Sequence, residues 1–499
     1  MTYNIYCDAL RSVSTSKRTE NGANAFSTTQ NAVVDLFATI GAMRNANESI
    51  WTTMDRLSSH VDAAYAEDPL LTARILFYAR DVRGGLGERE IFRMAMFHCA
   101  AAHPEVVSKN IRLIPEYGRW DDLFSLLNTP LEGDMWKLIA AQLAKDHEAL
   151  RTGQPVSLLA KWMPSAKTSS ADTMALARRA AENLGMSVYR YKRYIRDLRR
   201  HLDLLEQRMS AKQWSEVDYG HLPSQAHMRH VKAFYRNDGA RYTEYLEAVA
   251  KGEKRINTST LFPYEIVERI TPYSSKRESY ELMWKNLPDY VGEGRNVMVI
   301  ADTSGSMTGR PMDTSVSLAI YFAERNKGPF ANMYMTFSDM PQIIKVDPAS
   351  SLLDKIHQVM RGPWGQNTDL EAALKLLLDV AVHIHARQED LPVSLMVITD
   401  MEIDQGSVRL DRPWETIVDV MEQRYREAGY TMPNIVFWNV ASRHDTYLST
   451  ADHKGVQMVS GSSASVFRSA LGYARGMTPM EAVRQTLDVP RYADIAVGD

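Results

Sequence analysis

The sequence of 499 residues contains only two cysteines, Cys7 and Cys99, and no CxxC motif. Two distant cysteines argue against a disulfide framework and against a cysteine-based structural zinc site, and they fit a reducing compartment. No run of about 18 apolar residues occurs, which argues against a membrane span. The N-terminal residues also lack the apolar core of a secretory signal. We therefore expect a cytoplasmic protein that does not associate with membranes.

A strong excess of one charge is absent as well. The net charge is −3, and the composition is that of an ordinary globular protein, with 45% hydrophobic and 24% charged residues. Residues 1–292 hold 39 Lys+Arg against 35 Asp+Glu, a balance of +4, whereas residues 293–499 hold 19 against 26, a balance of −7. The length predicts more than one domain, and the charge divides between two parts of the chain.

The first part, residues 28–292, has almost no strand signals. Apolar residues recur at helical spacing, and short breaks rich in Gly, Pro, Asn or Asp separate the repeats. Examples are the segments 32–43, 68–82, 90–101, 135–150 and 173–185. Many successive amphipathic helices with short turns are typical of a HEAT-like α-helical repeat. Residues 1–27 form an N-terminal extension before it.

The second part, residues 293–499, follows a different pattern. Short apolar strands, NVMVIAD, NMYMTFS, VSLMVITD and PNIVFWNV, alternate with amphipathic helices. Continuous apolar strands joined by crossover helices predict a parallel sheet that is covered on both faces. The chain as a whole is thus expected to be α plus α/β, with a doubly wound C-terminal domain.

Oxygen-bearing side chains gather where those strands end. Asp302, Ser304 and Ser306 follow the first strand, Thr368 lies in the loop 365–369 before a helix, and Asp400 closes the strand 393–399. Ligands of doubly wound folds bind at the carboxyl ends of strands. Carboxylates and hydroxyls are hard ligands, which suit Mg²⁺ or Mn²⁺ and do not suit zinc. The segments therefore predict one divalent metal site.

Two other interpretations of these residues remain open. Asp302, Ser304 and Asp369 are each residues that commonly cap helix N-termini. The nearby acids Asp400 and Glu402 are compatible with a metal nuclease, although hydroxyl ligands favour a docking site over a two-metal hydrolytic centre.

The motifs DTSGSM, NTDL and ITDME resemble the three parts of the metal-ion-dependent adhesion site of von Willebrand factor A domains. Matched by position, Asp302, Ser304, Ser306, Thr368 and Asp400 correspond to its five ligand positions. The resemblance implies that the hydroxyls bind the ion directly and that the two aspartates often act through water. It also implies that a carboxylate from a protein partner completes the coordination.

The order of a helical part and an A domain resembles the Ro autoantigen family, whose helical TROVE module forms a ring closed by the A domain. The segments RDVRGGLGERE, IPEYGRWDDLF, LLAKWMPS and MSAKQWSEVDYGHLPSQA are similar to those of an uncharacterised family of phage, bacterial and plant proteins with the same architecture. The resemblance to Ro implies binding of small noncoding or misfolded RNA. A ring built from one chain also leads us to expect a monomer.

A basic stretch at residues 189–200 is a candidate RNA contact. It carries Arg190, Lys192, Arg193, Arg196, Arg199 and Arg200 among three tyrosines and a single acid. Cations serve phosphate contacts and aromatic rings serve base stacking. The alternative is a solvated helix whose arginines pair with nearby acids. A second, weaker basic cluster consists of His227, Arg229, His230, Lys232 and Arg236.

Motifs of enzymes are missing from the sequence. GxSxG and HExxH are absent, and the segment RGGLGE lacks the GK[ST] ending of a phosphate loop, so a turn between helices explains it better. We expect no enzyme. The first hypothesis is an RNA-binding protein whose A domain offers a metal-dependent docking site. The alternative is a protein-interaction scaffold that binds a partner carboxylate and no RNA.

Overall fold

The computed structural model describes residues 14–44, 48–271, 276–291, 297–361, 368–407, 411–472 and 476–498. It confirms a helical part followed by an α/β part. The helices of the first part are α2 (Ala32–Thr39), α3 (Ile50–Glu67), α4 (Pro69–Arg80), α5 (Arg89–Ala102), α6 (Pro104–Asn110), α7 (Ile114–Tyr117), α8 (Glu132–Arg151), α9 (Leu159–Trp162), α10 (Ala171–Asn183), α11 (Val188–His201), α12 (Leu205–Ser210), α13 (Ser224–Ala250), α14 (Pro263–Val267) and α15 (Arg277–Lys285). Short 3-10 turns, η1 to η4, lie between them at Ile111–Leu113, Trp120–Leu126, Trp214–Glu216 and Tyr219–His221. Among these described helices, none is long and apolar enough to cross a membrane.

Local sequence signals set where several of these helices begin. Asp68 caps α4 by accepting a hydrogen bond from the Leu71 amide, and Pro69 occupies the first turn, where its missing N–H has no partner to lose. Ser187 caps α11 in the same way. The predicted helical segments are thus confirmed, with ends that differ from the predicted ones by a few residues.

The second part is built on a six-stranded sheet in the order β5-β4-β3-β6-β7-β8. Its strands are β3 (Val297–Ala301), β4 (Met333–Thr336), β5 (Ile343–Lys345), β6 (Ser394–Thr399), β7 (Asn434–Asn439) and β8 (Val456–Ser460). Its helices and turns are η5 (Gly305–Met307), α16 (Arg310–Arg325), α17 (Leu352–Met360), α18 (Leu370–His383), η6 (Gln388–Asp390), α19 (Ile417–Glu427), α20 (Val466–Gly472), α21 (Pro479–Leu487) and η7 (Pro490–Tyr492).

The sheet departs from the all-parallel prediction at one edge. β3, β4, β6, β7 and β8 are parallel, but β5 pairs with β4 in the antiparallel sense. A short loop joins β4 to β5, and such a loop permits only an antiparallel return. β5 is only three residues long and largely exposed, so it carries none of the apolar signal that identifies the central strands.

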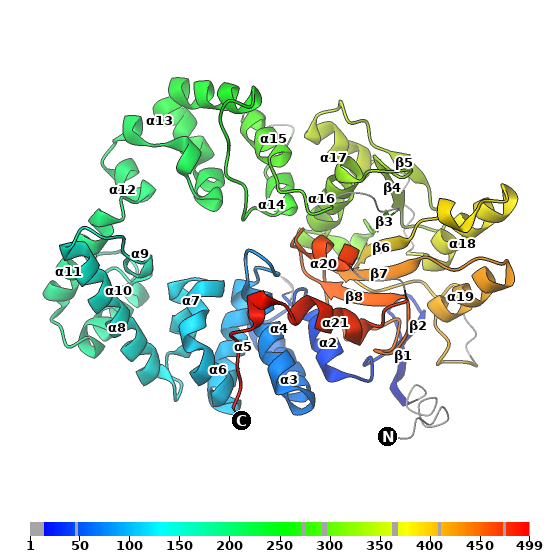
Figure 1. Cartoon of the computed structure of the whole chain (residues 1–499), viewed down its shortest axis with the longest axis horizontal. Helices are drawn as coiled ribbons and strands as arrows, with labels where there is room; N and C mark the ends of the chain where they lie inside the picture. Colours follow the sequence, from blue (N-terminus) through cyan, green and yellow to red (C-terminus); the bar gives the residue numbers. More distant parts are fainter. Residues whose placement is uncertain are drawn as a thin grey trace.

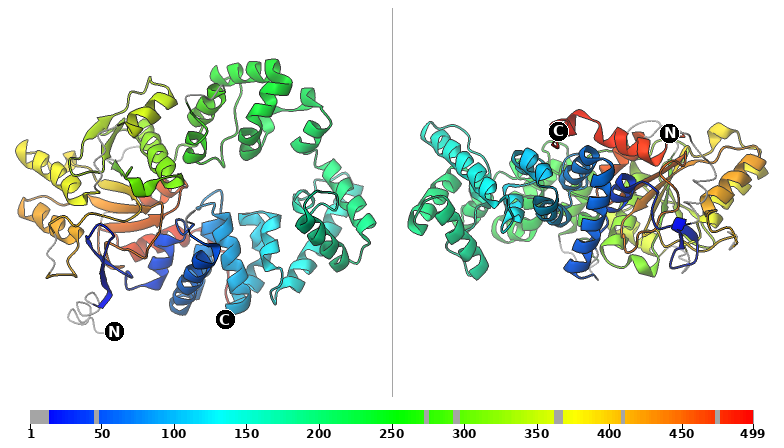
Figure 2. Two further views of the ribbon diagram at one scale, coloured as in Figure 1. Left: turned by 180° about the vertical axis from the view of Figure 1, so that it is seen from behind. Right: turned by 90° about the horizontal axis from the view of Figure 1, so that it is seen from below.

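The helices form an arc that starts and ends at the C-terminal domain, so that the whole chain makes a ring (Figures 1 and 2). At one end of the arc α2 packs on the edge strand β8, and at the other end α14 packs on α16. The loop between α4 and α5 contacts the segment after α2, where Leu86 lies beside Gly41, and it also contacts α16. Its Glu88 carboxylate accepts a hydrogen bond from Arg310 of α16 at 2.6 Å.

The glycine-rich turn between α4 and α5 packs closely against neighbouring segments. A Cβ at Gly85 would lie 2.0 Å from the carbonyl oxygen of Tyr78, and one at Gly87, whose φ is +69°, would lie 2.6 Å from the ring of Phe262. Phe262 is the residue before α14, so the turn between α4 and α5 contacts the segment that leads into α14. The amides of residues 85–88 donate to carbonyls of α4 and Asp81. The interpretation of RGGLGE as a helix–helix turn therefore explains this segment fully.

Described segments near both ends of the chain contact the part to which they do not belong in sequence. Residues 16–26, within the predicted N-terminal extension, form the hairpin β1 (Ser16–Arg18) and β2 (Asn24–Phe26), which lies on the C-terminal domain. At the other end, Arg491 forms an ion pair with Asp81 of the helical part at 2.8 Å. The two parts of the chain that differ in sequence pattern are thus connected by contacts of the hairpin at residues 16–26 and of Arg491.

A buried charge network stabilises the helical part near η2. The Asp122 carboxylate is fully buried and accepts 2.7 Å hydrogen bonds from Arg80 and Arg93. Removing one member of a buried ion pair leaves an uncompensated charge. We expect Asp122→Ala to lower the free energy of unfolding by about 3–5 kcal/mol, measured by urea denaturation.

Asp134→Ala is the matched control, because Asp134 pairs with Lys137 on the surface, where both side chains are about half exposed or more. Exposed pairs contribute little to stability. Equal losses in the two variants would contradict the role assigned to the buried network.

Candidate metal centre

The loop after β3 holds a carboxylate in a fixed position. Asp302 is fully buried, its Oδ1 accepts the Ser304 amide at 2.8 Å, and its Oδ2 accepts the Thr399 hydroxyl at 2.8 Å. Burial, with the nearby Asp400 carboxylate as a second cause, raises the pKa of Asp302 to about 6. A carboxylate in these surroundings is destabilised when charged, and a cation beside it would relieve that cost.

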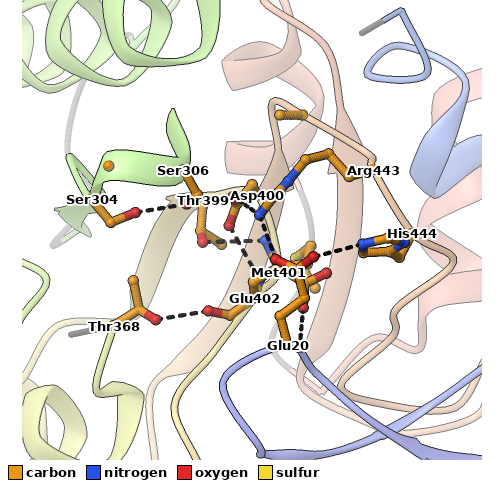
Figure 3. Close-up of polar contacts among 12 residues, drawn as sticks. Glu20, Ser304, Ser306, Thr368, Thr399, Asp400, Met401, Glu402, Arg443 and His444 are labelled. Carbon is orange, nitrogen blue, oxygen red and sulfur yellow. Dashed lines mark hydrogen bonds and ion pairs between the residues drawn. The ribbon is translucent and has the colours of Figure 1, made fainter. Parts of the chain in front are cut away.

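Two hydroxyls from the same loop lie beside each other. The Oγ atoms of Ser304 and Ser306 are 3.0 Å apart (Figure 3), because Ser304 directly precedes the turn η5 and Ser306 lies within it. Ser306 is exposed, so the site is open to solvent there. Neither Asp302 nor Ser304 caps a helix with its side chain in the described structure, whereas Asp369 does cap α18.

Asp400 reaches the same edge of the sheet from the end of β6, the strand next to β3. Its Oδ1 accepts the Glu402 amide at 3.2 Å, and its Oδ2 forms an ion pair with Arg443 at 2.7 Å. Asp302 and Asp400 thus bring two buried carboxylates to one place. Arg443 balances the charge of Asp400, but the hydrogen bonds to Asp302 come from neutral groups.

Thr368 lies at this end of the domain with its hydroxyl turned to a different group. Its Oγ1 donates to the carbonyl oxygen of Glu402 at 2.7 Å and accepts from Asn21 at 3.2 Å, and its amide donates to Asp404 at 2.8 Å. A hydroxyl that donates its proton to Glu402 keeps lone pairs on its oxygen, so this hydrogen bond is compatible with metal ligation by Thr368. Residues 365–367 of the predicted loop lie outside the described residues.

The donor set fits a hard divalent cation. It consists of two carboxylates and three hydroxyls, without sulfur or imidazole, and such oxygen ligands suit Mg²⁺ or Mn²⁺. Asp302 is fully buried and its hydrogen bonds from Ser304 and Thr399 come from neutral groups, so its charge is not balanced by a cation of the described protein. The residues present therefore fit the ion that the sequence predicts. When bound, the ion would supply an open coordination position for an oxygen ligand.

Sequence reasoning missed the residues that flank this centre from the N-terminal hairpin and from the loop after β7. Arg443 also pairs with Glu20 at 3.1 Å, and Glu20 accepts a hydrogen bond from His444 at 2.9 Å (Figure 3). The hydrogen bond from His444 and the nearby Arg443 lower the pKa of Glu20 although partial burial opposes the shift. The signal that could have identified Arg443 and His444 is their position just after the apolar strand 434–439, at the same sheet edge as Asp302 and Asp400.

The basic stretch predicted at residues 189–200 is helix α11, and one of its faces is a cationic stripe. With about 3.6 residues per turn, Tyr189, Lys192, Arg193, Arg196 and Arg200 fall in one sector of about 100°. All five side chains are exposed, and Tyr189 is 77% exposed. The opposite face packs on α8, α9 and α10. We call these five residues the α11 stripe.

The two remaining candidates of α11 lie off the stripe. Arg199 donates from its guanidinium to the carbonyl oxygens of Ala160 and Met163, so its side chain takes part in packing α9. Arg190 is exposed at the flank of the helix. Within the stripe, Arg196 pairs with Asp197 at 3.1 Å, while Lys192, Arg193 and Arg200 form no ion pair with any residue that the structure describes.

The residues of the second basic cluster differ in burial, so they do not form one exposed surface. His227 is buried, its Nε2 lies 2.9 Å from the Tyr242 hydroxyl, and burial lowers its pKa to about 4. A neutral histidine inside an aromatic cluster has a structural role. Arg229, Lys232 and Arg236 are exposed on α13.

Two known proteins are similar to this chain along most of its length, one in structure and one in sequence. The crystal structure of the Deinococcus radiodurans Ro (RSR) protein superimposes with a TM-score of 0.50 at 13% sequence identity, covering 92% of this chain and 100% of that one. An uncharacterized protein of Acanthamoeba polyphaga mimivirus, L728, is 28% identical over 515 aligned residues, covering 94% of this chain and 87% of its own length. The first likeness shows that the chain has a Ro-like fold.

Two family models match successive parts of the sequence. Residues 296–489 match a domain of unknown function, DUF7788. Residues 19–138 and 134–294, together more than half of the chain, match a second model. The chain belongs to the family of that second model, which is described as a domain of unknown function, DUF2828.

Proposed function

We propose that this protein binds RNA through the α11 stripe and that its C-terminal domain, similar to von Willebrand A domains, carries a divalent-metal docking site. The observation that supports RNA binding best is the stripe itself, in which four exposed cations and an exposed tyrosine share one helix face. Lysine and arginine contact phosphates, and an exposed ring stacks on unpaired bases. Small noncoding or single-stranded RNA fits this combination.

The position of α11 supports the same proposal. The helix lies on the side of the ring away from the C-terminal domain (Figure 1), so RNA on the stripe leaves the metal centre free. The Ro-like fold is the reason to expect an RNA ligand. The resemblance to Ro proteins implies small noncoding or misfolded RNA. On this proposal the protein is a binding protein and not an enzyme, and a single chain forms the functional ring.

The salt dependence of RNA binding tests the proposal. Fluorescence anisotropy with a labelled single-stranded RNA would be recorded over a range of salt concentrations, with and without EDTA. Contacts to phosphates release counterions, so we expect affinity to fall steeply with salt. Because the metal centre is separate from the stripe, EDTA should leave the affinity unchanged. Absence of measurable binding at low salt would contradict the proposal.

The metal centre supports a second function, the capture of a protein partner. Asp302, Ser304, Ser306, Thr368 and Asp400 are the residues proposed to hold Mg²⁺ or Mn²⁺, with a partner carboxylate at the open position. Ser306 is exposed, which gives such a partner access. This second function predicts an interaction that EDTA abolishes.

Arg443 is expected to weaken metal binding, because its guanidinium holds Asp400 at 2.7 Å and repels an incoming divalent ion. Replacing Arg443 with alanine should therefore tighten the binding of Mg²⁺ by about tenfold, which corresponds to about 1.4 kcal/mol. Isothermal titration calorimetry with Mg²⁺ or Mn²⁺ measures the change.

Arg426→Ala is the control, since Arg426 lies on α19 and pairs with Glu422 on the surface. It should leave the affinity for the ion as it is. Weaker binding in Arg443→Ala would show instead that Arg443 holds Asp400 in its binding position.

A further inference from the structure

Three potential metal ligands converge in the helical part, far along the chain from the A-domain residues. The Nε2 atoms of His98 and His103 lie 2.6 Å and 2.7 Å from the same oxygen, Oδ1 of Asp62. His98 belongs to α5, His103 follows the end of α5, and Asp62 belongs to α3. Among the described residues this is the one group of three His, Cys, Asp or Glu ligand atoms that lie within 4.8 Å of one another.

The His103 imidazole is held in place by its surroundings. His103 stacks on Tyr65 with ring centroids 4.0 Å apart, and the Tyr65 hydroxyl donates to Glu105. His103 occupies the position before α6 but makes no side-chain capping bond to that helix, so its ring is turned toward Asp62. Two rings that present their Nε2 atoms at one point are what a metal site needs from its ligands, even though the ring planes themselves lie at 75° to each other.

An ordinary histidine–carboxylate contact does not require this arrangement. A carboxylate has two oxygens, yet both rings approach Oδ1, and within the described part of the chain Oδ2 accepts no hydrogen bond. The three ligand atoms are therefore gathered at one point, as they would be around a single ion.

We propose that Asp62, His98 and His103 form a binding site for a transition-metal ion of the Zn²⁺, Co²⁺ or Ni²⁺ class. Two neutral imidazoles and one carboxylate are ligands that these ions prefer, whereas Mg²⁺ and Ca²⁺ prefer oxygen alone. Three protein ligands leave a coordination position open to water. The Asp62 side chain is 49% exposed and the histidines are 18% and 15% exposed, so the open position faces solvent.

Metal binding asks for a small adjustment of the side chains. Ligands at about 2.1 Å from a tetrahedral ion lie about 3.4 Å from one another, so the present contacts must open by less than about 1 Å. Rotation of the half-exposed Asp62 carboxylate can provide this. The adjacent Cys99 is not a ligand, because it is fully buried and burial raises the pKa of its thiol to about 12.

The test uses the full-length, untagged protein with Co²⁺ as a spectroscopic probe and Zn²⁺ as a competitor. Excess Mg²⁺ is present throughout, so that it occupies the proposed A-domain site and Co²⁺ does not bind there. We expect one Co²⁺ per chain, visible by its d–d absorption, and displacement of that Co²⁺ by Zn²⁺. His98→Gln and His103→Gln should each weaken binding by more than about tenfold, the loss expected even for a partner that only supports a ligand.

Two control variants make the result specific. His221→Gln removes another histidine that contacts an aspartate, Asp218, at 2.7 Å, but without a second imidazole, and it should bind Co²⁺ as the unaltered protein does. Asp302→Asn should do the same, which separates this site from the proposed metal centre. No Co²⁺ binding, or binding that survives both His98→Gln and His103→Gln in folded protein, would overturn the proposal.

Discussion

Replacing Lys192, Arg193, Arg196 and Arg200 together with glutamine is expected to lower the affinity for single-stranded RNA by about 100-fold near physiological salt. Each phosphate contact to a single strand contributes about 0.7 to the slope of log affinity against log salt. Four lost contacts should therefore also reduce that slope by about 3. These side chains are exposed, so the fold should survive the change. Anisotropy titrations at several salt concentrations measure both quantities.

A control of equal charge shows whether the position of the cations matters. Four exposed cations that pair with nearby acids can be replaced by glutamine together, namely Lys137, Arg151, Arg387 and Arg426. This variant should lose far less affinity than the α11 variant, because its cations are scattered over the surface. Similar losses in both variants would indicate that RNA responds only to net charge, and the α11 stripe would not be the binding surface.

Asp302→Asn should abolish detectable binding of Mg²⁺ to the C-terminal domain. The substitution keeps the shape of the side chain but removes the buried charge that lies beside Ser304 and Asp400. A hard divalent ion depends on that charge more than on any of the neutral hydroxyls. Calorimetry with Mg²⁺ measures the loss, and the same preparation should bind RNA as tightly as the unaltered protein.

Asp313→Asn is the matched control for this experiment. Burial, with Glu268 nearby, also raises the pKa of Asp313 to about 6, but Asp313 lies in the first turn of α16 and not at the sheet edge. Its replacement should leave Mg²⁺ binding intact. If Asp302→Asn bound Mg²⁺ normally, the assignment of the metal centre to this loop would be wrong.

The sequence predicted the architecture where periodicity was strong. The apolar strand 297–301 and the capped helix at Pro69–Arg80 were both identified, because their patterns extend over a whole element. Strand β8 and the exposed edge strand β5 were missed, since β5 has only three residues and little burial. The closure of the ring was not predictable from local patterns, because it depends on contacts such as Glu88 with Arg310.

The candidate sites were predictable to different degrees. Asp302, Ser304 and Asp400 could be placed together because neighbouring parallel strands end at one edge of a sheet. The side-chain partners could not be predicted: the ion pair of Arg443 with Asp400 joins separate loops. The same holds for Asp62 and its two histidines, which come from α3 and the end of α5 and share no sequence motif.

The most direct test of RNA binding is to purify the full-length protein from the cells that produce it and to identify what accompanies it. Nuclease-sensitive absorbance and sequencing would be combined with mass spectrometry, in parallel preparations with and without EDTA. The account predicts small RNAs that remain in EDTA, leave in high salt and are missing from the α11 variant. Protein free of RNA, carrying a partner that EDTA releases, would contradict it and leave the metal-dependent docking function.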